Sequence, residues 1–179
     1  YATELGLGTC WVGGTFNQSR FADKIVLRGS ESVPAVSPVG YGTEKRAIMD
    51  TMARWSAGSA RRKPWEELFF SPTGALSRAE AGIYAEPLEM VRLAPSASNL
   101  QPWRVLKEEG RDTFHFFLNR TPGIRLLFVN KADLQRVDIG IAMCHFELTA
   151  QAGGRSGTWA VNAPPRNHSL GEYIVSWAA

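Results

Sequence analysis

The stretch that most constrains the fold is Leu93 to Arg104, which reads LAPSASNLQPWR. Pro95 must end a helix that arrives from the preceding residues, because proline lacks the backbone N–H and disfavours helical geometry in the residue before it. The short polar side chains of Ser96 and Ser98 favour a turn, since they bond to nearby backbone groups. The stretch therefore predicts a helix over residues 87–94, then a polar loop, then a new element.

The same loop carries two amide side chains. Asn99 and Gln101 each have two N–H donors and a carbonyl acceptor, which suits them to recognise the edge of a heterocyclic ring. Pro102 then fixes where Trp103 lies. An ordinary polar loop before a strand would use the same residues, so the loop chemistry alone leaves both interpretations open.

The full string APSASNLQPWR resembles the flavin-contacting loop of the nitroreductase family. Members of this family are FMN-dependent NAD(P)H oxidoreductases, in which PSxxNxQPW borders the isoalloxazine and ribityl groups. The resemblance implies contact with FMN for a run of loop residues: Pro95, Ser96, Ala97, Ser98 and Asn99. Gln101, which we also assign to the cofactor site, and Trp103 are expected to shape the loop and its pocket.

A glycine-rich loop follows the first residues of the chain. Gly6 suits a helix C-cap, which needs the left-handed conformation. The glycines after it let a backbone approach a flat ligand closely, although such a loop is weak evidence by itself. GLGTCWVGG resembles the second hallmark of nitroreductases, and this implies that the backbone at Gly13 and Gly14 faces the flavin N5 and O4 edge. Donors there would stabilise the reduced flavin.

A basic segment, ARRKPWEELFF, resembles the late KxRxPxEEL segment of the family, whose basic residues bind the FMN phosphate. Arg62 falls on the family arginine, and Pro64 keeps the register. Ala60 stands where a lysine is usual. The resemblance thus leaves Arg62, with possible help from Arg61, as the expected phosphate ligand, and a guanidinium offers the fork that phosphate favours. The alternative for this cluster is an ordinary solvated surface.

Composition places the chain of 179 residues among ordinary globular proteins, with 44% hydrophobic and 21% charged residues. No apolar run is long enough to span a bilayer, so a membrane protein is not indicated. The net charge is +3, and the Lys and Arg residues are spread along the chain among 17 acidic residues. Nucleic-acid binding normally needs a concentrated basic face, so this distribution argues against it. The two cysteines form no CxxC pair and favour a reducing compartment, so we expect a cytoplasmic enzyme.

Periodicity predicts several further elements. Strands over Trp103–Lys107 and Thr113–Leu118 should pair across a turn at Gly110. Helical spacing predicts a long helix over Ala132–Ala152 and shorter ones elsewhere. The remaining expectations are a helix over Asn17–Leu27, an edge strand over Val33–Val39 and a helix over Glu44–Trp55. His115 and His145 are expected to be packed structural residues, because no second ligand lies at metal spacing, and we predict no metal site.

The segment AQAGGRSGTW is similar to the opening ATELGLGTCW. Three residues of one copy fall on three of the other at one constant offset, namely Ala150, Gly154 and Trp159 on Ala2, Gly6 and Trp11. This match predicts an internal duplication. The second copy lacks the paired glycines, so we infer one functional and one degenerate flavin site.

The order of the motifs is the reverse of that in ordinary nitroreductases. It resembles the branch in which one chain holds two fused half-units and imitates the usual dimer. We therefore expect an α+β, nitroreductase-like fold with a mixed or antiparallel sheet and surrounding helices. It should be a pseudo-dimer in which 1–86 is the C-terminal part of the first half and 87–179 is the second half. The chain shows no RSxR segment and no initiator Met, so we expect that an upstream half is missing, that part of the phosphate site is missing with it, and that FMN binding is weak.

These resemblances imply an enzyme that uses FMN to transfer hydride from NAD(P)H to a nitroaromatic, a quinone or a related small-molecule acceptor. The flavin supplies the demanding chemistry, so we name no catalytic side chain. Two alternatives remain open. The same fold supports other flavin chemistry, such as dehalogenation, azoline oxidation or flavin cleavage, and a degenerate pseudo-dimer would bind flavin or a partner without turnover.

Overall fold

The computed structural model describes residues 1–13, 16–29, 31–42, 58, 61–123, 133–162, 164 and 169–179. The chain divides into two compact units. The first unit comprises Tyr1–Ala57 and Pro122–Leu134, and the second comprises Gly58–Thr121 and Gln135–Ala179. This division follows the packing of the chain, whereas the predicted boundary after residue 86 concerns its duplication, so that boundary stays a prediction.

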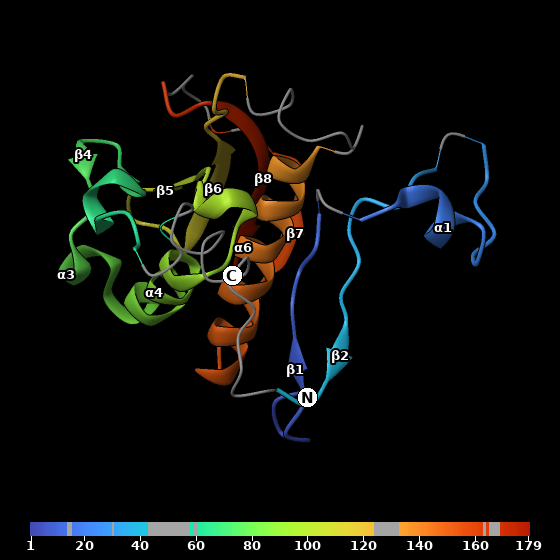
Figure 1. Ribbon diagram of the computed structural model, residues 1–179. Helices are drawn as coiled ribbons and strands as arrows, with labels where there is room; N and C mark the ends of the chain where they lie inside the picture. Colours follow the sequence, from blue (N-terminus) through green and yellow to red (C-terminus); the bar gives the residue numbers. More distant parts are fainter. Residues whose placement is uncertain are drawn as a thin grey trace. The chain divides into compact units, whose positions relative to one another are not determined.

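A six-stranded sheet forms the centre of the second unit, in the order β4-β3-β5-β6-β8-β7 (Figure 1). Its strands are β3 (Phe69–Ser71), β4 (Gly74–Ala75), β5 (Trp103–Lys107), β6 (Thr113–Leu118), β7 (Thr158–Ala160) and β8 (Glu172–Ala178). The pairing of β3 with β5 is parallel, and the other pairings are antiparallel. The expected mixed sheet is confirmed, and β5 and β6 have the predicted bounds.

The turn between β5 and β6 explains why these two strands were predictable. Gly110 adopts φ +69°, a conformation that glycine accepts at little cost. On one face of β6, Phe114 and Phe116 are fully buried against the helices. On the opposite face, His115 is buried and its Nδ1 lies 2.7 Å from Ser176 Oγ. His115 is thus packed within the sheet, as expected.

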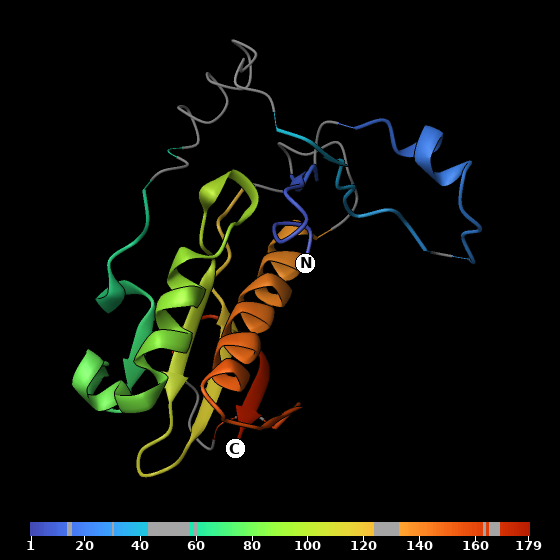
Figure 2. The same ribbon diagram turned by 90° about the horizontal axis from the view of Figure 1, so that it is seen from below.

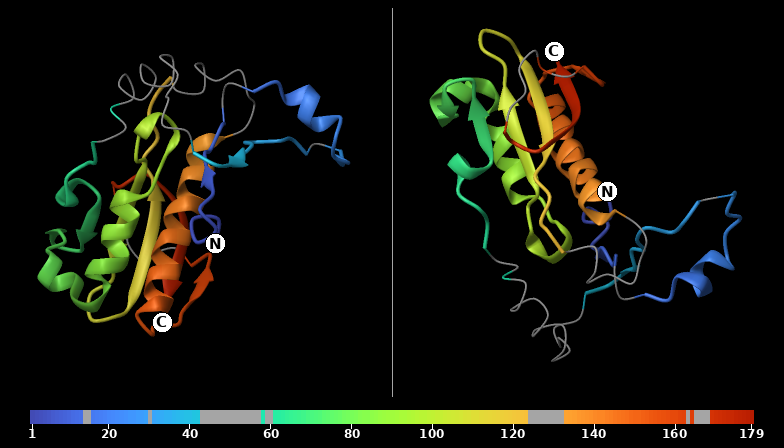
Figure 3. Two further views of the ribbon diagram at one scale, coloured as in Figure 1. Left: turned by 60° about the horizontal axis from the view of Figure 1, so that its bottom comes forward. Right: turned by 90° about the horizontal axis from the view of Figure 1, so that it is seen from above.

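Two helices, α4 (Ala85–Leu93) and α6 (Leu134–Ala152), lie side by side across one face of this sheet (Figures 2 and 3). The predicted helix before Pro95 is confirmed, because Ala94 leaves helical geometry at ψ 145°. Helix α6 confirms the predicted long helix. The shorter turns before α4 are η1 (Trp65–Glu67), α3 (Arg78–Ala81) and η2 (Gly82–Tyr84). Ser77 and Glu80 form a capping box that begins α3.

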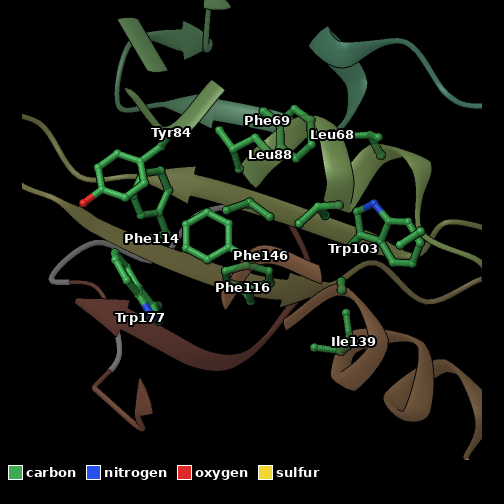
Figure 4. Close-up of a cluster of buried hydrophobic side chains, with 14 of the residues drawn as sticks. Leu68, Phe69, Tyr84, Leu88, Trp103, Phe114, Phe116, Ile139, Phe146 and Trp177 are labelled. Atoms are coloured by element: carbon green, nitrogen blue, oxygen red, sulfur yellow. The ribbon is translucent and has the colours of Figure 1, made fainter. Parts of the chain in front are cut away.

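Aromatic side chains fill the space between the sheet and the helices (Figure 4). Phe146, from α6, lies 5.0 Å from Phe114 and 5.2 Å from Trp177, measured between ring centroids. Tyr84 packs against the same cluster, 4.8 Å from Phe114. These rings meet at tilted or edge-to-face angles, which aromatic pairs favour. The core therefore fixes α6 firmly against the sheet.

The first unit contains β1 (Gly8–Thr9), α1 (Gln18–Ala22) and β2 (Val39–Gly40). The strand expected over 33–39 is reduced to β2 and a single bridge from Val36 to Val12, because its prolines cannot donate to a ladder. The helix expected over 17–27 ends at Ala22, since so short a helix gains few hydrogen bonds for its nucleation cost. The predicted helix over 44–55 lies outside the described residues.

The helix turn at the start of the chain ends as predicted. Gly6 has φ +70°, and its N–H donates to Thr3 O at 3.0 Å. Leu7 N–H donates to Ala2 O at 2.9 Å. This pair of bonds is the Schellman motif, which satisfies carbonyls at the end of a helix.

The second copy of the repeated sequence ends a helix in the same way. Gly154 has φ +75°, and its N–H donates to Gln151 O at 2.9 Å. Arg155 N–H donates to Ala150 O, also at 2.9 Å. The two copies therefore share a local structure as well as a residue pattern.

Candidate functional site

The loop between α4 and β5 has an unusual backbone. It contains the short helix η3 (Ala97–Asn99). Ser98, Asn99 and Gln101 adopt φ of 49°, 54° and 48° although none is glycine. Each such residue costs on the order of 1–3 kcal/mol, so the conformation persists only where its surroundings hold it. Backbone strain of this kind is concentrated at binding and catalytic sites.

Asn99 joins this loop to the basic segment. Its Nδ2 donates to the carbonyls of Gly58 and Arg61, both at 2.8 Å. Its Oδ1 accepts a hydrogen bond from Arg62 Nη1 at 3.1 Å. Two stretches that the sequence singled out separately are therefore in direct contact within the second unit. The Asn99 side chain is engaged with protein groups, and its contact with FMN stays a prediction.

Gln101 is buried beneath the loop, with 3% of its surface exposed. Its Oε1 accepts from Lys63 N at 2.7 Å, and its own N–H donates to Ser96 Oγ at 2.9 Å. Its Nε2 donates to Asn99 O at 3.1 Å. Gln101 therefore shapes the loop from within.

Arg62 lies where α4, the loop and the basic segment meet. Its Nε and Nη2 donate to Leu93 O, both at 3.2 Å, and its Nη1 also donates to Arg61 O at 3.0 Å. The guanidinium thus stabilises the joint between these segments. Its predicted role as the phosphate ligand stays a prediction, and a phosphate would have to compete with these carbonyl acceptors.

Two further cations converge beside Arg62. Lys63 Nζ and Arg104 Nη1 both donate to Gln101 O, at 3.4 Å and 3.3 Å. Burial, followed by the neighbouring Arg104, lowers the pKa of Lys63, and burial likewise lowers the pKa of Arg104. Glu67 opposes both shifts. Two half-buried basic side chains near one carbonyl place positive charge beside Arg62, which suits an anionic group.

Helix α6 reaches the loop through a residue that the sequence analysis did not name. Asp138 Oδ1 accepts a hydrogen bond from Ala97 N at 2.9 Å, and only 3% of Asp138 is exposed. The available signal was an acidic residue within the apolar stripe of a long helix. Such a buried carboxylate needs a hydrogen-bond donor nearby, and the loop supplies one.

Two buried donors near this loop have no hydrogen-bond acceptor in the part of the chain that the structure describes. They are Nε2 of Gln135, which lies one turn before Asp138, and Nε1 of Trp103, which follows the loop. A buried donor without a partner costs about 1–3 kcal/mol. Trp103 is fully buried in the hydrophobic core and 3% of Gln135 is exposed, so these donors contribute to the packing behind the loop.

The outer residues of the loop are accessible. Pro95 and Ser98 are exposed, and Ser96 and Ala97 are half-buried. A separate shallow cavity of about 210 Å³ lies at the opposite end of β5, where the β3–β4 and β5–β6 turns meet. Its lining includes Ser71 and Lys107 and none of the predicted site residues.

The glycines of the predicted flavin edge belong to the first unit. A Cβ atom added at Gly13 would lie 3.0 Å from Leu134 Cδ2, so this position has little room for a side chain. Gly14 lies outside the described residues. The predicted meeting of Gly13 with the Asn99 loop at one cofactor stays a prediction.

Within the described residues, no group of His, Cys, Asp and Glu is arranged to hold a metal ion. In the same part of the chain, no helix combines the length and the apolar character that crossing a membrane requires.

The chain was compared with known proteins. Residues 1–150 match the family model described as "Putative TM nitroreductase". A crystal structure of a putative nitroreductase from Thermotoga maritima is similar, with a TM-score of 0.56 and 22% sequence identity. The match covers 98% of this chain and 57% of that one, so this chain spans little more than half the length of its structural relative. No curated protein matches the sequence.

Proposed function

Because the chain belongs to the family described as "Putative TM nitroreductase", we propose that it is an oxidoreductase that binds FMN at the loop between α4 and β5. The observation that carries the proposal is the junction at Asn99, which ties the left-handed loop to the basic segment. A strained loop beside half-buried cations suits a ligand with a flat polar ring and an anionic tail.

The loop would border the isoalloxazine ring with its accessible residues, which are Pro95, Ser96, Ala97, Ser98 and Asn99. Gln101 would hold the loop in shape from below. The backbone at Gly13 and Gly14 would donate to the N5 and O4 edge.

The phosphate end would lie at the basic segment. Arg62 is the proposed ligand, and Lys63 and Arg104 add positive charge beside it. A phosphate oxygen there would replace a carbonyl as an acceptor of Arg62. That exchange is favourable because a phosphate oxygen carries negative charge, so its bond to the guanidinium is stronger than the bond of the guanidinium to a neutral carbonyl.

FMN would supply the transfer of two electrons as hydride from NAD(P)H to a nitroaromatic, a quinone or a related acceptor. The residues of the chain would bind and orient the cofactor and keep one ring face accessible to substrates. We assign no side chain as an acid or a nucleophile.

We also propose that the chain is a pseudo-dimer of two related halves. The matching Schellman motifs at Gly6, which ends a turn, and at Gly154, which ends α6, support the duplication, because they fall at the same position of the repeat. In addition, β3 belongs to the predicted first half, 1–86, yet it pairs with β5 of the second half. The halves would therefore share strands as well as the cofactor.

Spectroscopy of the purified protein tests the proposed function. FMN added to the flavin-free protein should be bound, one per chain, and its absorbance should bleach when NADH or NADPH is added without oxygen. A nitroaromatic or a quinone should then restore the absorbance. Binding without bleaching would indicate a flavin-binding module without turnover, and no binding would exclude the FMN assignment.

A variant at the separate cavity provides the control. Thr73→Ala changes a residue that lines this cavity and lies outside the proposed site. It should bind FMN like the wild type.

A further inference from the structure

The hydrogen bond from Ala97 to Asp138 differs from the other bonds that hold the loop. The side-chain bonds of Asn99 and Gln101 come from within the loop or from residues 58–63. Asp138 instead lies on α6, one position before Ile139, which is 1% exposed in the hydrophobic core. It therefore links the loop to a helix that the aromatic core fixes in place.

The direction of this bond explains the shape of the loop. In a trans peptide the N–H and the C=O point in opposite directions. When Ala97 N–H points to Asp138, the carbonyl of Ser96 in the same peptide must point away from it. Ser96 O accepts a hydrogen bond from Asn99 N at 3.0 Å. This second bond closes the turn in which Ser98 and Asn99 adopt their left-handed conformations.

We propose that Asp138 is a positioning residue for the cofactor loop: its carboxylate sets the orientation of the Ser96–Ala97 peptide before the cofactor binds. This inference rests on the proposed function, which supplies FMN as the ligand. The way in which Asp138 acts follows from the geometry of the loop alone. A loop held in its binding conformation loses less conformational entropy on binding, so this contact raises affinity without touching the ligand.

Two substitutions at Asp138 separate the hydrogen bond from the packing. Asp138→Leu keeps the branched shape of the side chain and removes both acceptors, whereas Asp138→Asn keeps one amide oxygen that can accept from Ala97. Glu147→Leu is the matched control, because Glu147 is an acidic residue on α6 that bonds to Gln151 instead of the loop. Hydrogen exchange of the loop amides in the flavin-free protein measures how firmly the Ala97–Asp138 bond holds the loop. FMN titration measures the effect of this bond on affinity.

Asp138→Leu should speed exchange of the Ala97 and Asn99 amides and weaken FMN binding about tenfold or more, while β5 and β6 keep their protection. Asp138→Asn should restore most of the amide protection and most of the FMN affinity. The control Glu147→Leu should match the wild type in both measurements. Unchanged loop exchange in Asp138→Leu would overturn the proposal. An equal loss of protection in the loop and in β5 would also overturn the proposal, because it would show that Asp138 supports the fold in general instead of the loop.

A substitution on the other side of the bond tests the same contact independently. Ala97→Pro removes the donor, and Ser96 already has the extended conformation that precedes proline, at φ −147° and ψ 158°. The losses of FMN affinity in Ala97→Pro and Asp138→Leu should not add in the double variant, because both remove one bond. Additive losses would contradict the assignment.

Hydrogen exchange of the loop amides needs no flavin, so it tests the role of the Ala97–Asp138 bond even if the wild type binds no FMN. Failure of the proposed function would therefore be distinguishable from failure of this inference.

Discussion

Asn99 combines two demands at one position, a left-handed backbone and a side chain that bridges two segments. Asparagine tolerates this backbone better than most residues, and its amide reaches Gly58 O and Arg61 O. The two demands can be separated by substitution. Asn99→Gly removes the bridge and leaves the left-handed backbone unstrained, whereas Asn99→Ala removes the bridge and strains this backbone.

We expect both variants to weaken FMN binding and Asn99→Ala to be the less stable by about 1 kcal/mol. Urea denaturation followed by circular dichroism measures the difference in unfolding free energy. Equal stability of the two variants would show that the backbone at this position is not strained.

Arg62 gives a second prediction at the scale of the residue. Arg62→Ala should weaken FMN more than riboflavin, by on the order of 1.5–3 kcal/mol, because a charge-assisted bond to phosphate is lost only with FMN. Fluorescence titration with the two flavins measures this difference. The same loss for both would assign Arg62 a structural role alone, through its bonds to Leu93 O at the end of α4.

At this scale the sequence identified the residues of the loop but not the way in which they are held. The string around Asn99 and Gln101 was conspicuous, whereas the bridge to Arg61 and Arg62 depends on tertiary contact. The contact of Asp138 with the loop was not predictable from the sequence, because an acidic residue in an amphipathic helix normally belongs to its solvated face.

Among the elements, those with strong local signals were predictable. The strands that pair around Gly110 have clear alternation and a turn residue, and α4 ends where Pro95 requires. In contrast, β3 has three residues, and its parallel partner β5 begins more than thirty positions later in the chain. Nothing local specifies such a pairing, because parallel strands are joined by long connections.

The contact of α6 with α4 predicts a dependence of stability on pH. Burial lowers the pKa of His145, although a hydrogen bond to the Met90 backbone opposes this shift. The unfolded chain therefore binds a proton at a higher pH than the folded protein does. Stability should fall as the pH decreases from about 7 through and below the ordinary histidine value of about 6.5.

His145→Gln should lessen this loss. Thermal unfolding of both proteins between about pH 7 and pH 5 measures it, a range above the ordinary carboxylate values. A variant that loses as much stability as the wild type over this range would show that His145 does not cause the dependence.

At the scale of the whole molecule, the buried core of the described residues lies almost entirely in the second unit. Among the described residues of 1–42, no hydrophobic side chain is buried, and Trp11 and Val26 are 59% and 91% exposed. The sequence could suggest the duplication that we propose but not the packing of each copy.

The aromatic core gives a prediction for global stability. Phe146→Ala should lower the unfolding free energy by about 3–5 kcal/mol, because it removes a fully buried ring between Phe114 and Trp177. Leu148→Ala, two positions along the same helix, changes a side chain that is 60% exposed and should alter stability by less than about 0.5 kcal/mol. Denaturant titration of both variants makes the comparison, and similar losses would contradict the assigned core.

We propose that the loop between α4 and β5 forms part of an FMN site. Amide chemical shifts recorded during titration with FMN test it most directly, because they locate the ligand on the chain without assuming an activity. We predict the largest changes at Ala97, Ser98 and Asn99, with the cavity residues Ser71 and Gly110 unchanged. Shifts confined to that cavity, or no shifts at all, would contradict the account.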